Sequence, residues 1–204
     1  MTIEMINECA RCRVCEDAAY QAPPVAYVGD FDSPILVVAQ NPGEIKSGDL
    51  VRKATARNML LKANRTTADS DISDVILGWY FEDFTTSPGY KEMSKLFGKD
   101  WLLSGIYLYT NAVRCRTQFN KSPSSQMQTE CWKYTRQLLF DREAVVMIGS
   151  VAKQQVCGTM KLTKSVATLV DGKYYLYIPH YVRWTAPKIE AYQYALRSIL
   201  DEKL

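Results

Sequence analysis

The chain has 204 residues, 47% of them hydrophobic, and a formal net charge of +3. This composition predicts one globular domain spanning residues 1–204, and so small a charge does not by itself establish nucleic-acid binding. The short polar N-terminus does not resemble a signal peptide, and no apolar run approaches the roughly 18 residues of a membrane span. We therefore expect a soluble, cytoplasmic, monomeric protein.

Strands and helices are expected to alternate along most of the chain. Four apolar runs have the composition of buried strands, at residues 35–39, 106–110, 144–149 and 174–178. Helices are expected at residues 53–64, 124–139, 150–156 and 187–203, with two more inside 65–104 that break around 87–89. This alternation predicts an α/β fold, a three-layer α/β/α sandwich around a mostly parallel four-stranded sheet.

Polar or turn-forming residues follow three of the expected strands. Gln40 and Asn41 follow the first strand, Asn111 follows the second, and His180 follows the fourth. Ligands of parallel sheets bind at the carboxyl ends of the strands. We therefore expect these side chains to face one cleft.

The six cysteines are not expected to form disulfides in a reducing cytoplasm, which leaves metal ligation as their better use. The candidate ligands form two sequence-distant pairs, Cys9 with Cys12 and Cys115 with Cys131. Four thiolates suit either a structural zinc ion or an iron–sulfur cluster, and the spacing alone leaves both open. Cys15 offers an alternative first pair with Cys12, and Cys157 is left over.

Several segments together resemble the uracil-DNA glycosylase superfamily, most closely its iron–sulfur branch, the family 4 enzymes. The similar segments are Cys9-Ala10-Arg11-Cys12, Val37-Val38-Ala39-Gln40-Asn41-Pro42-Gly43, Tyr109-Thr110-Asn111-Ala112-Val113-Arg114-Cys115-Arg116, Asn120-Lys121-Ser122-Pro123 with Cys131, and Ile148-Gly149-Ser150-Val151-Ala152. The resemblance covers residues 9–64 and 105–204, so residues 65–104 form an insertion relative to the family.

The resemblance implies a [4Fe–4S] cluster as the cofactor, held by Cys9, Cys12, Cys115 and Cys131. Its expected role is structural, because it would join the N-terminal segment to the loop 116–123 and present basic residues to DNA.

The resemblance also implies roles for three side chains. Asn41 would orient a water molecule against the sugar carbon, and Asn111 would read a flipped pyrimidine through its amide. His180, the only histidine, would stabilise the departing base. In this chain His180 follows Pro179, whereas the family motif has histidine before proline.

The base pocket departs from the family pattern. Gln40 is expected to contact the base or the water, and Gly43 to bring backbone amides close to the base or a phosphate. Leu50 stands in the segment where the family has a phenylalanine that stacks on the base. The insertion 65–104, rich in aromatic residues, would supply a substitute lid, a roomier pocket or simply an extra apolar layer.

Basic residues gather near the cysteines and the motif loops, where phosphate contacts would be needed. They are Arg11, Arg13, Lys46, Arg52, Lys53, Arg114, Arg116, Lys121 and Arg183. Arg116, Lys121 and Arg183 are the main candidates for contacts with DNA, the expected partner.

The sequence thus predicts a monofunctional DNA glycosylase that excises uracil or a modified, bulky pyrimidine and leaves an abasic site. Two other interpretations stay open: a non-catalytic DNA-binding protein on the same fold, and a zinc-stabilised RNA-binding module.

Overall fold

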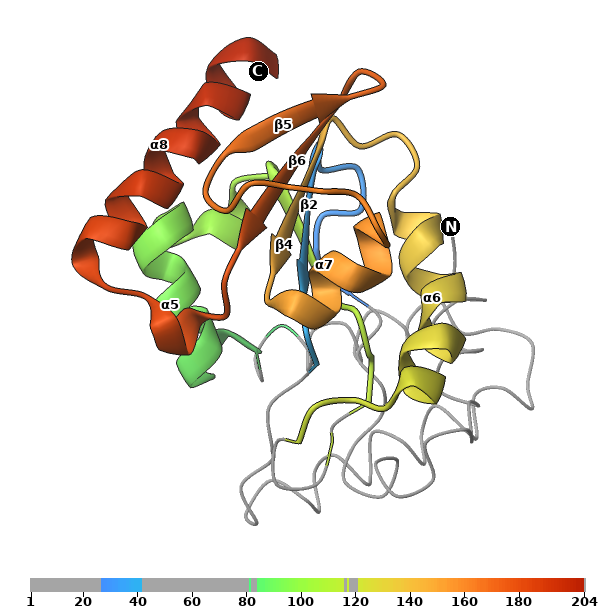
Figure 1. The fold of residues 1–204 in the computed structure, drawn as a ribbon. Coiled ribbons are helices and arrows are strands. Elements are labelled where there is room, and N and C mark those ends of the chain that lie inside the picture. Colours follow the sequence, from blue (N-terminus) through green and yellow to red (C-terminus); the bar gives the residue numbers. More distant parts are fainter. Residues whose placement is uncertain (1–26, 42–80, 82–83, 116, 118–120, 204) are drawn as a thin grey trace, which may run out of the picture.

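The computed structural model of the chain describes residues 27–41, 81, 84–115, 117 and 121–203 (Figure 1). The helix expected at residues 53–64 lies outside the described residues.

A six-stranded mixed sheet forms the centre of the described fold. Its strands are β1 (Val28–Gly29), β2 (Ile35–Ala39), β3 (Tyr107–Asn111), β4 (Ala144–Ile148), β5 (Ala167–Val170) and β6 (Lys173–Ile178), in the spatial order β1-β3-β2-β4-β6-β5. The inner strands β3, β2, β4 and β6 run parallel, whereas β1 and β5 pair antiparallel at the two edges. The four expected strands are these inner ones, so the expected count of four was too low.

The inner strands are apolar because both faces of the sheet are covered. All residues of β2, β3 and β4 are buried, as expected for parallel strands between two layers of helices. Strand β6 alternates between buried and half-buried residues, with Tyr174, Leu176 and Ile178 on the more deeply buried face. This difference reflects its place next to the edge strand β5.

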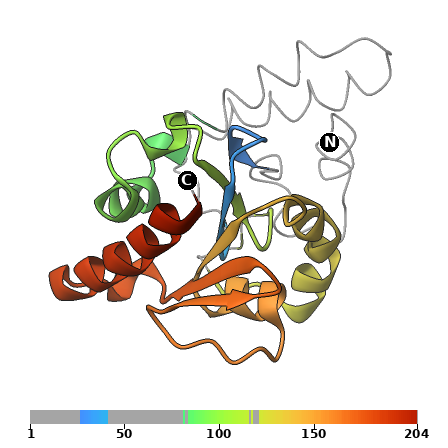
Figure 2. The same cartoon turned by 90° about the horizontal axis from the view of Figure 1, so that it is seen from above.

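Four α-helices and two short 3₁₀ helices belong to the described residues. They are α5 (Pro88–Phe97), η2 (Trp101–Leu103), α6 (Ser125–Leu138), α7 (Ser150–Cys157), η4 (Tyr181–Arg183) and α8 (Ala186–Lys203). Helices α5 and α8 pack together on one side of the sheet, and α6 and α7 pack together on the other (Figures 1 and 2). None of the described helices has the length and apolar character needed to cross a membrane.

The expected helix boundaries agree with the observed ones because local capping residues set them. The Ser87 hydroxyl accepts a hydrogen bond from the Tyr90 backbone N–H at 3.1 Å, and Pro88 begins α5. The Ser124 hydroxyl accepts from the Met127 backbone N–H at 3.2 Å and caps α6. Such caps satisfy backbone donors that have no partner within the helix.

The described part of residues 65–104, which the sequence resemblance predicts to be an insertion, forms an aromatic layer on strand β3. Its rings pack against one another and against two tyrosines of β3; they are Phe84, Tyr90, Phe97, Trp101, Tyr107 and Tyr109. Helix α5 then joins this layer to α8. For these residues, the interpretation of the insertion as an extra apolar layer agrees with the packing.

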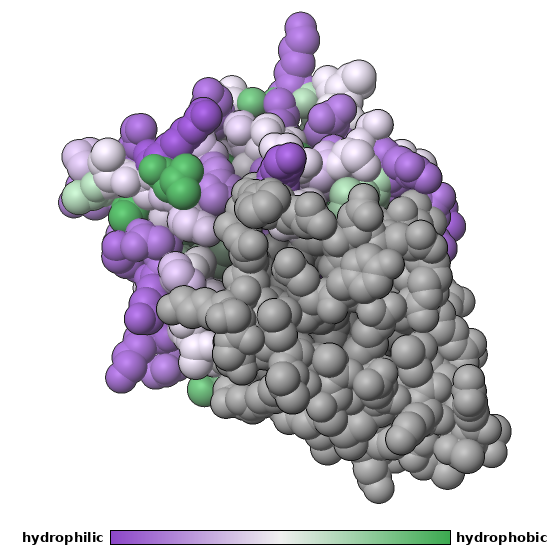
Figure 3. Space-filling model, turned by 90° about the horizontal axis from the view of Figure 1, so that it is seen from below, coloured by the Kyte–Doolittle hydropathy of each residue, from purple (hydrophilic) through white to green (hydrophobic). Residues whose placement is uncertain are grey.

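The view from below looks at the carboxyl ends of the parallel strands. On the described part of this face the surface is mainly hydrophilic, with a few separate apolar spots (Figure 3).

Candidate functional site

Residues that follow β2, β4 and β6 meet at the carboxyl edge of the sheet, around Gly149. A Cβ atom added to Gly149 would lie 3.7 Å from Cδ2 of His180 and 3.8 Å from Oε1 of Gln40. Gly149 itself has φ of 93° and ψ of 162°, a conformation that glycine tolerates far better than other residues. The backbone turn after β4 therefore brings the side chains of Gln40 and His180 together.

Asn111 ends the neighbouring strand β3, opposite Ala39 in the register. The backbone N–H of Val113 donates to the Gln40 carbonyl at 2.9 Å, which ties the two strand ends together beyond the sheet. The Asn111 side chain is buried, at 2% exposure, and its Oδ1 accepts a hydrogen bond from the Tyr109 hydroxyl at 3.0 Å. Asn111 was predicted as a site residue, whereas Tyr109 was not.

Asn41 joins the loop after β2 to the loop before α6. Its Nδ2 donates to the Thr117 hydroxyl at 3.2 Å, and that hydroxyl donates to the Lys121 carbonyl. Two loops far apart in the sequence are thereby held together at the same edge of the sheet. Thr117 was not foreseen as part of the site, since its partner lies 76 residues away.

His180 is half-buried beside the ring of Tyr181, with 4.2 Å between ring centroids. Burial lowers the pKa of His180 below 6.5, and the nearby positive charge of Arg183 lowers that pKa further. The imidazole is therefore neutral at pH 7. A neutral imidazole carries one N–H donor and one acceptor, and it holds no charge to attract an anion before the chemistry begins.

The turn that carries His180 rests on helix α5. The ring of Tyr181 lies 3.7 Å from the position of a Cβ on Gly89, and burial followed by the charge of Glu92 raises the pKa of Tyr181. The Trp184 indole N–H donates to the Pro179 carbonyl at 2.7 Å, which closes the turn from the other end. This contact between α5 and the turn was not predicted, because no local sequence pattern indicates it.

Cys115 and Cys131 belong to one small buried cluster, separate from the main core. The thiol residues are 5% and 3% exposed, and they share the cluster with Val113 and the partly buried Met127. Within the described residues, no three or more side chains of His, Cys, Asp and Glu are arranged to hold a metal ion. Two of the four expected ligands, Cys9 and Cys12, lie outside that part, as does the alternative Cys15.

Cys157 is in a different environment, on helix α7. Its Sγ lies 3.2 Å from Sδ of Met147, and burial raises the pKa of the Cys157 thiol to about 11. It is a protonated, packed thiol at neutral pH, consistent with its being left out of the expected ligand set.

The basic residues expected to contact DNA differ in whether they are exposed, buried or outside the described residues. Lys121 and Arg183 are exposed beside the carboxyl edge, whereas Arg116 lies outside the described residues, together with Gly43 and Leu50. Arg114 is only 1% exposed, and its Nη1 donates to the backbone carbonyl of Asn111. Arg114 therefore supports the end of β3 from inside, and its inclusion among surface phosphate contacts was wrong.

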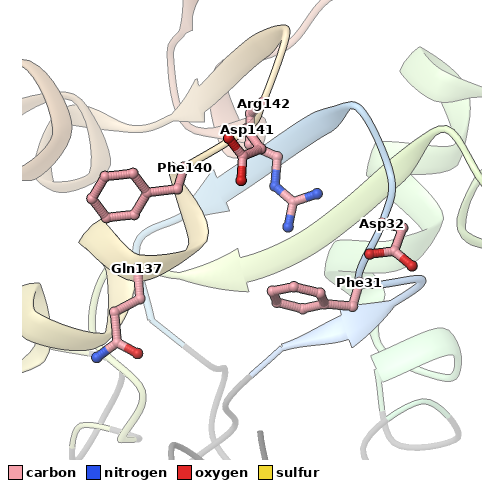
Figure 4. Close-up of a pocket in the computed structure, with 6 residues that line it drawn as sticks. All are labelled: Phe31, Asp32, Gln137, Phe140, Asp141 and Arg142. Atoms are coloured by element: carbon pink, nitrogen blue, oxygen red, sulfur yellow. The ribbon is translucent and has the colours of Figure 1, made fainter. Parts of the chain in front are cut away.

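A separate cavity of about 380 Å³ lies at the opposite, amino edge of the sheet (Figure 4). It is lined by Phe31, Asp32, Gln137, Phe140, Asp141 and Arg142. The Arg142 guanidinium donates to the carbonyls of Leu138 and Ser33 and lies 5.0 Å from the centre of the Phe31 ring. Burial lowers the pKa of Arg142, while Asp32, Asp141 and Asp30 act in the opposite direction. None of the sequence-predicted site residues lines this cavity.

No protein-family model matches the chain, and no curated protein sequence matches it.

Proposed function

We propose that the protein is a monofunctional DNA glycosylase of the uracil-DNA glycosylase type, which hydrolyses the N-glycosidic bond of a flipped pyrimidine nucleotide. The observation that carries this proposal is the meeting of Gln40 and His180 around Gly149 at the carboxyl edge. Asn111 ends the adjacent strand of the same edge. This edge is where an α/β sheet binds its ligands.

The chemistry needs only a few groups. Cleavage of a glycosidic bond passes through a state resembling an oxocarbenium ion, so the protein must stabilise the departing base as an anion and position one water molecule. His180 suits the first task, because its lowered pKa keeps the imidazole neutral and able to donate a hydrogen bond to a base oxygen. Donation from a neutral group to a developing anion is stronger in the transition state than in the ground state.

Asn41 suits the second task through its carbonyl oxygen, which accepts a hydrogen bond from water but is a poor base. Its Nδ2 is used in the bond to Thr117, and this bond orients the amide. Asn111 would read the base, and Gln40 would contact the base or the water. Because no lysine nucleophile takes part in this scheme, the product is an abasic site in an unbroken strand.

We further propose that Cys9, Cys12, Cys115 and Cys131 hold a [4Fe–4S] cluster. In support, Cys115 and Cys131 occupy one small buried cluster, which provides two of the four thiolates that such a cluster requires. When bound, the cluster would supply structural cross-linking rather than base chemistry. The visible absorption spectrum and the iron and zinc contents of the purified protein test this, since stoichiometric zinc without iron would favour the RNA-binding interpretation instead.

DNA is the proposed partner, gripped through its phosphates by Lys121 and Arg183, with Arg116 as a third candidate. Both described residues are exposed next to the carboxyl edge. Such contacts position the strand without reading its sequence. Binding should therefore weaken steeply as salt rises.

The test of the activity is base release from oligonucleotides that carry uracil or substituted pyrimidines. Asn41→Ala should reduce release by about a hundredfold. Thr117→Val should retain release within about threefold, because it removes the two hydrogen bonds of the Thr117 hydroxyl, with Asn41 and with the Lys121 carbonyl, but leaves the Asn41 carbonyl oxygen in place. Full release by Asn41→Ala would overturn its catalytic role. No release from any of these substrates by the wild-type protein would overturn the enzyme proposal.

A non-catalytic DNA-binding protein is the second candidate. Two observations favour it: Asn111 is only 2% exposed, and the Asn41 amide is engaged with Thr117. In this case both asparagines would serve as structural links. Tight, salt-dependent binding of DNA without release of any base would distinguish it from the glycosylase.

A further inference from the structure

Within the described part of the chain, the His180 imidazole makes no hydrogen bond. Its described ring contact is with Tyr181, at 4.2 Å between the ring centroids and 33° between the ring planes. A histidine that takes part in catalysis usually has one ring nitrogen hydrogen-bonded to a group that holds the imidazole in place. Here the group that touches the imidazole is the ring of the next residue in the chain.

A contact between two rings restrains an imidazole differently from a hydrogen bond. It limits the tilt of the ring plane, because tilting would either separate the rings or press them together. It occupies neither ring nitrogen and does not select which nitrogen carries the proton. The one N–H donor and the one acceptor of the neutral imidazole therefore both stay available to a ligand.

The ring of Tyr181 is itself held from two other directions. Its Cε1 and Cζ atoms lie 3.7 and 3.9 Å from the position of a Cβ on Gly89, where η4 meets helix α5 (Figure 1). The Trp184 ring meets the tyrosine edge-on, with 6.4 Å between centroids and 80° between planes. A ring packed in this way has little freedom to move away from His180.

The backbone of this turn is fixed on both sides of His180. The Trp184 indole N–H donates to the Pro179 carbonyl at 2.7 Å. The backbone N–H of Arg183 donates to the His180 carbonyl, and that of Trp184 donates to the Tyr181 carbonyl, both at 3.0 Å. These bonds fix where the two side chains leave the backbone, so the side-chain torsions of His180 remain for the ring contact to restrain.

We propose that Tyr181 is a positioning residue, which holds the plane of the His180 imidazole at the carboxyl edge through contact between the two rings. Helix α5 then contributes to the site without providing a reacting group, because it supports the ring of Tyr181 at Gly89. The proposal rests on the proposed function and adds to it a residue that acts through His180.

The surroundings of the two rings give this proposal a direct readout. The charged groups nearby are Arg183, which lowers the pKa of His180, and Glu92 of α5, which raises the pKa of Tyr181. Gln40, which faces the imidazole from the loop after β2, is uncharged. Burial is the larger cause of the lowered pKa of His180. Because the ring of Tyr181 covers one side of the imidazole, its removal should raise this pKa towards 6.5.

The experiment compares Tyr181→Ala, which removes the ring, with Tyr181→Phe, which keeps the ring and removes only the hydroxyl. Single-turnover base release is measured at about pH 8, where an ordinary histidine is neutral, so that protonation does not enter. NMR titration of the single histidine gives its pKa. Tyr181→Ala should lower release about tenfold and raise the pKa of His180. Tyr181→Phe should retain release within about twofold and leave the pKa as in the wild-type protein.

Tyr175→Ala is the matched control, because it removes another half-buried tyrosine that packs on the core and has no described ring contact with His180. Release is expressed per folded molecule, with thermal unfolding as the measure of folding. Tyr181→Leu, which fills part of the space without a flat ring, is the second variant if Tyr181→Ala does not fold, and it should show a similar loss of release.

Unchanged release in the variants without the ring, or an unchanged pKa of His180 in Tyr181→Ala, would overturn the role of Tyr181. An equal loss in Tyr181→Phe or in Tyr175→Ala would also overturn it, because the ring contact would then not be the cause. If the pKa changes as expected while the wild-type protein releases no base, the glycosylase proposal fails and the hold of Tyr181 on His180 stands.

Discussion

The two edges of the parallel sheet differ in how far their polar side chains are used in internal hydrogen bonds. At the amino edge, Arg142 donates to two backbone carbonyls, and the Lys173 ammonium donates to a third, that of Leu139. At the carboxyl edge, the His180 imidazole and the Nδ2 of Asn111 make no hydrogen bond with any other described residue. The amino edge uses its buried cation to hold loops, whereas the carboxyl edge combines one such link, from Asn41 to Thr117, with donors that have no hydrogen-bond partner among the described residues.

The comparison teaches that a cavity need not lie at the edge where the site is proposed. The hollow at the amino edge has a charged and aromatic lining, yet its most buried polar group is used internally (Figure 4). Loops that follow parallel strands converge at the carboxyl edge, and this geometry favours ligand binding there. The two edges therefore predict different consequences of mutation, on stability at one edge and on activity at the other.

The largest expected effect is on stability, at the amino edge. Arg142→Ala should lower the free energy of unfolding by about 3 kcal/mol, because it leaves the Leu138 and Ser33 carbonyls without their charged donor. Denaturant titration measures this, with Arg136→Ala as the control, because Arg136 is an exposed arginine in the last turn of the preceding helix α6. Base release per folded molecule should be unchanged by Arg142→Ala. If Arg142→Ala lost base release while its free energy of unfolding stayed at the wild-type value, the amino edge would affect activity and not stability, which would contradict the comparison of the two edges.

At the carboxyl edge, His180→Ala should lower the rate of base release by about a hundredfold. The free energy of unfolding should fall by less than about 1 kcal/mol, because His180 is only half-buried and its one described ring contact is with Tyr181. Single-turnover rates and denaturant titrations measure the two effects. An unaltered rate would remove His180 from the proposed mechanism.

Gly149→Ala should affect both stability and activity. Backbone strain should cost about 1–3 kcal/mol, and the added methyl group would stand between His180 and Gln40. Gly172→Ala is the matched control, because Gly172 also has a positive φ, 78°, but a Cβ there would meet nothing within 4 Å. Thermal unfolding should detect a loss in both variants, and release should fall further in Gly149→Ala. Equal release by the two variants would count against Gly149 as the centre of the site.

The smallest expected effect is electrostatic. Because the chain has a single histidine, an NMR titration can measure the pKa of His180 directly, and this pKa should lie below 6.5. Arg183→Gln should raise the pKa of His180 but leave it below 6.5, because burial is the larger cause of the lowered value. Below pH 6.5 the unfolded chain binds a proton that the folded protein resists, so stability is lost as pH falls from 6.5 through the lowered pKa. Base release should decline over the same range, and a midpoint at or above 6.5 would contradict the burial of His180.

The inner strands and the described helices could be predicted because their signals are local. The apolar runs at β2 and β4, the serine caps at Ser87 and Ser124, and the glycine after β4 each act within a few residues. The hairpin of β5 and β6 was missed, although Asp171-Gly172 is a strong turn signal. Strand β1 has only two residues and exists through pairing with β3, so no local pattern marked it.

The residues of the candidate site were predicted only in part, because some of their contacts do not follow from local sequence signals. Residues at the ends of parallel strands must meet, so the sequence by itself determined that Gln40, Asn111 and His180 would share one edge. It did not determine the hydrogen bond from Asn41 to Thr117, the packing of α5 under Tyr181, or the hydrogen bond from the Tyr109 phenol to Asn111. These contacts depend on how loops and layers pack in three dimensions, and only the tertiary structure decided them, because no local pattern records which distant group becomes a side chain's partner.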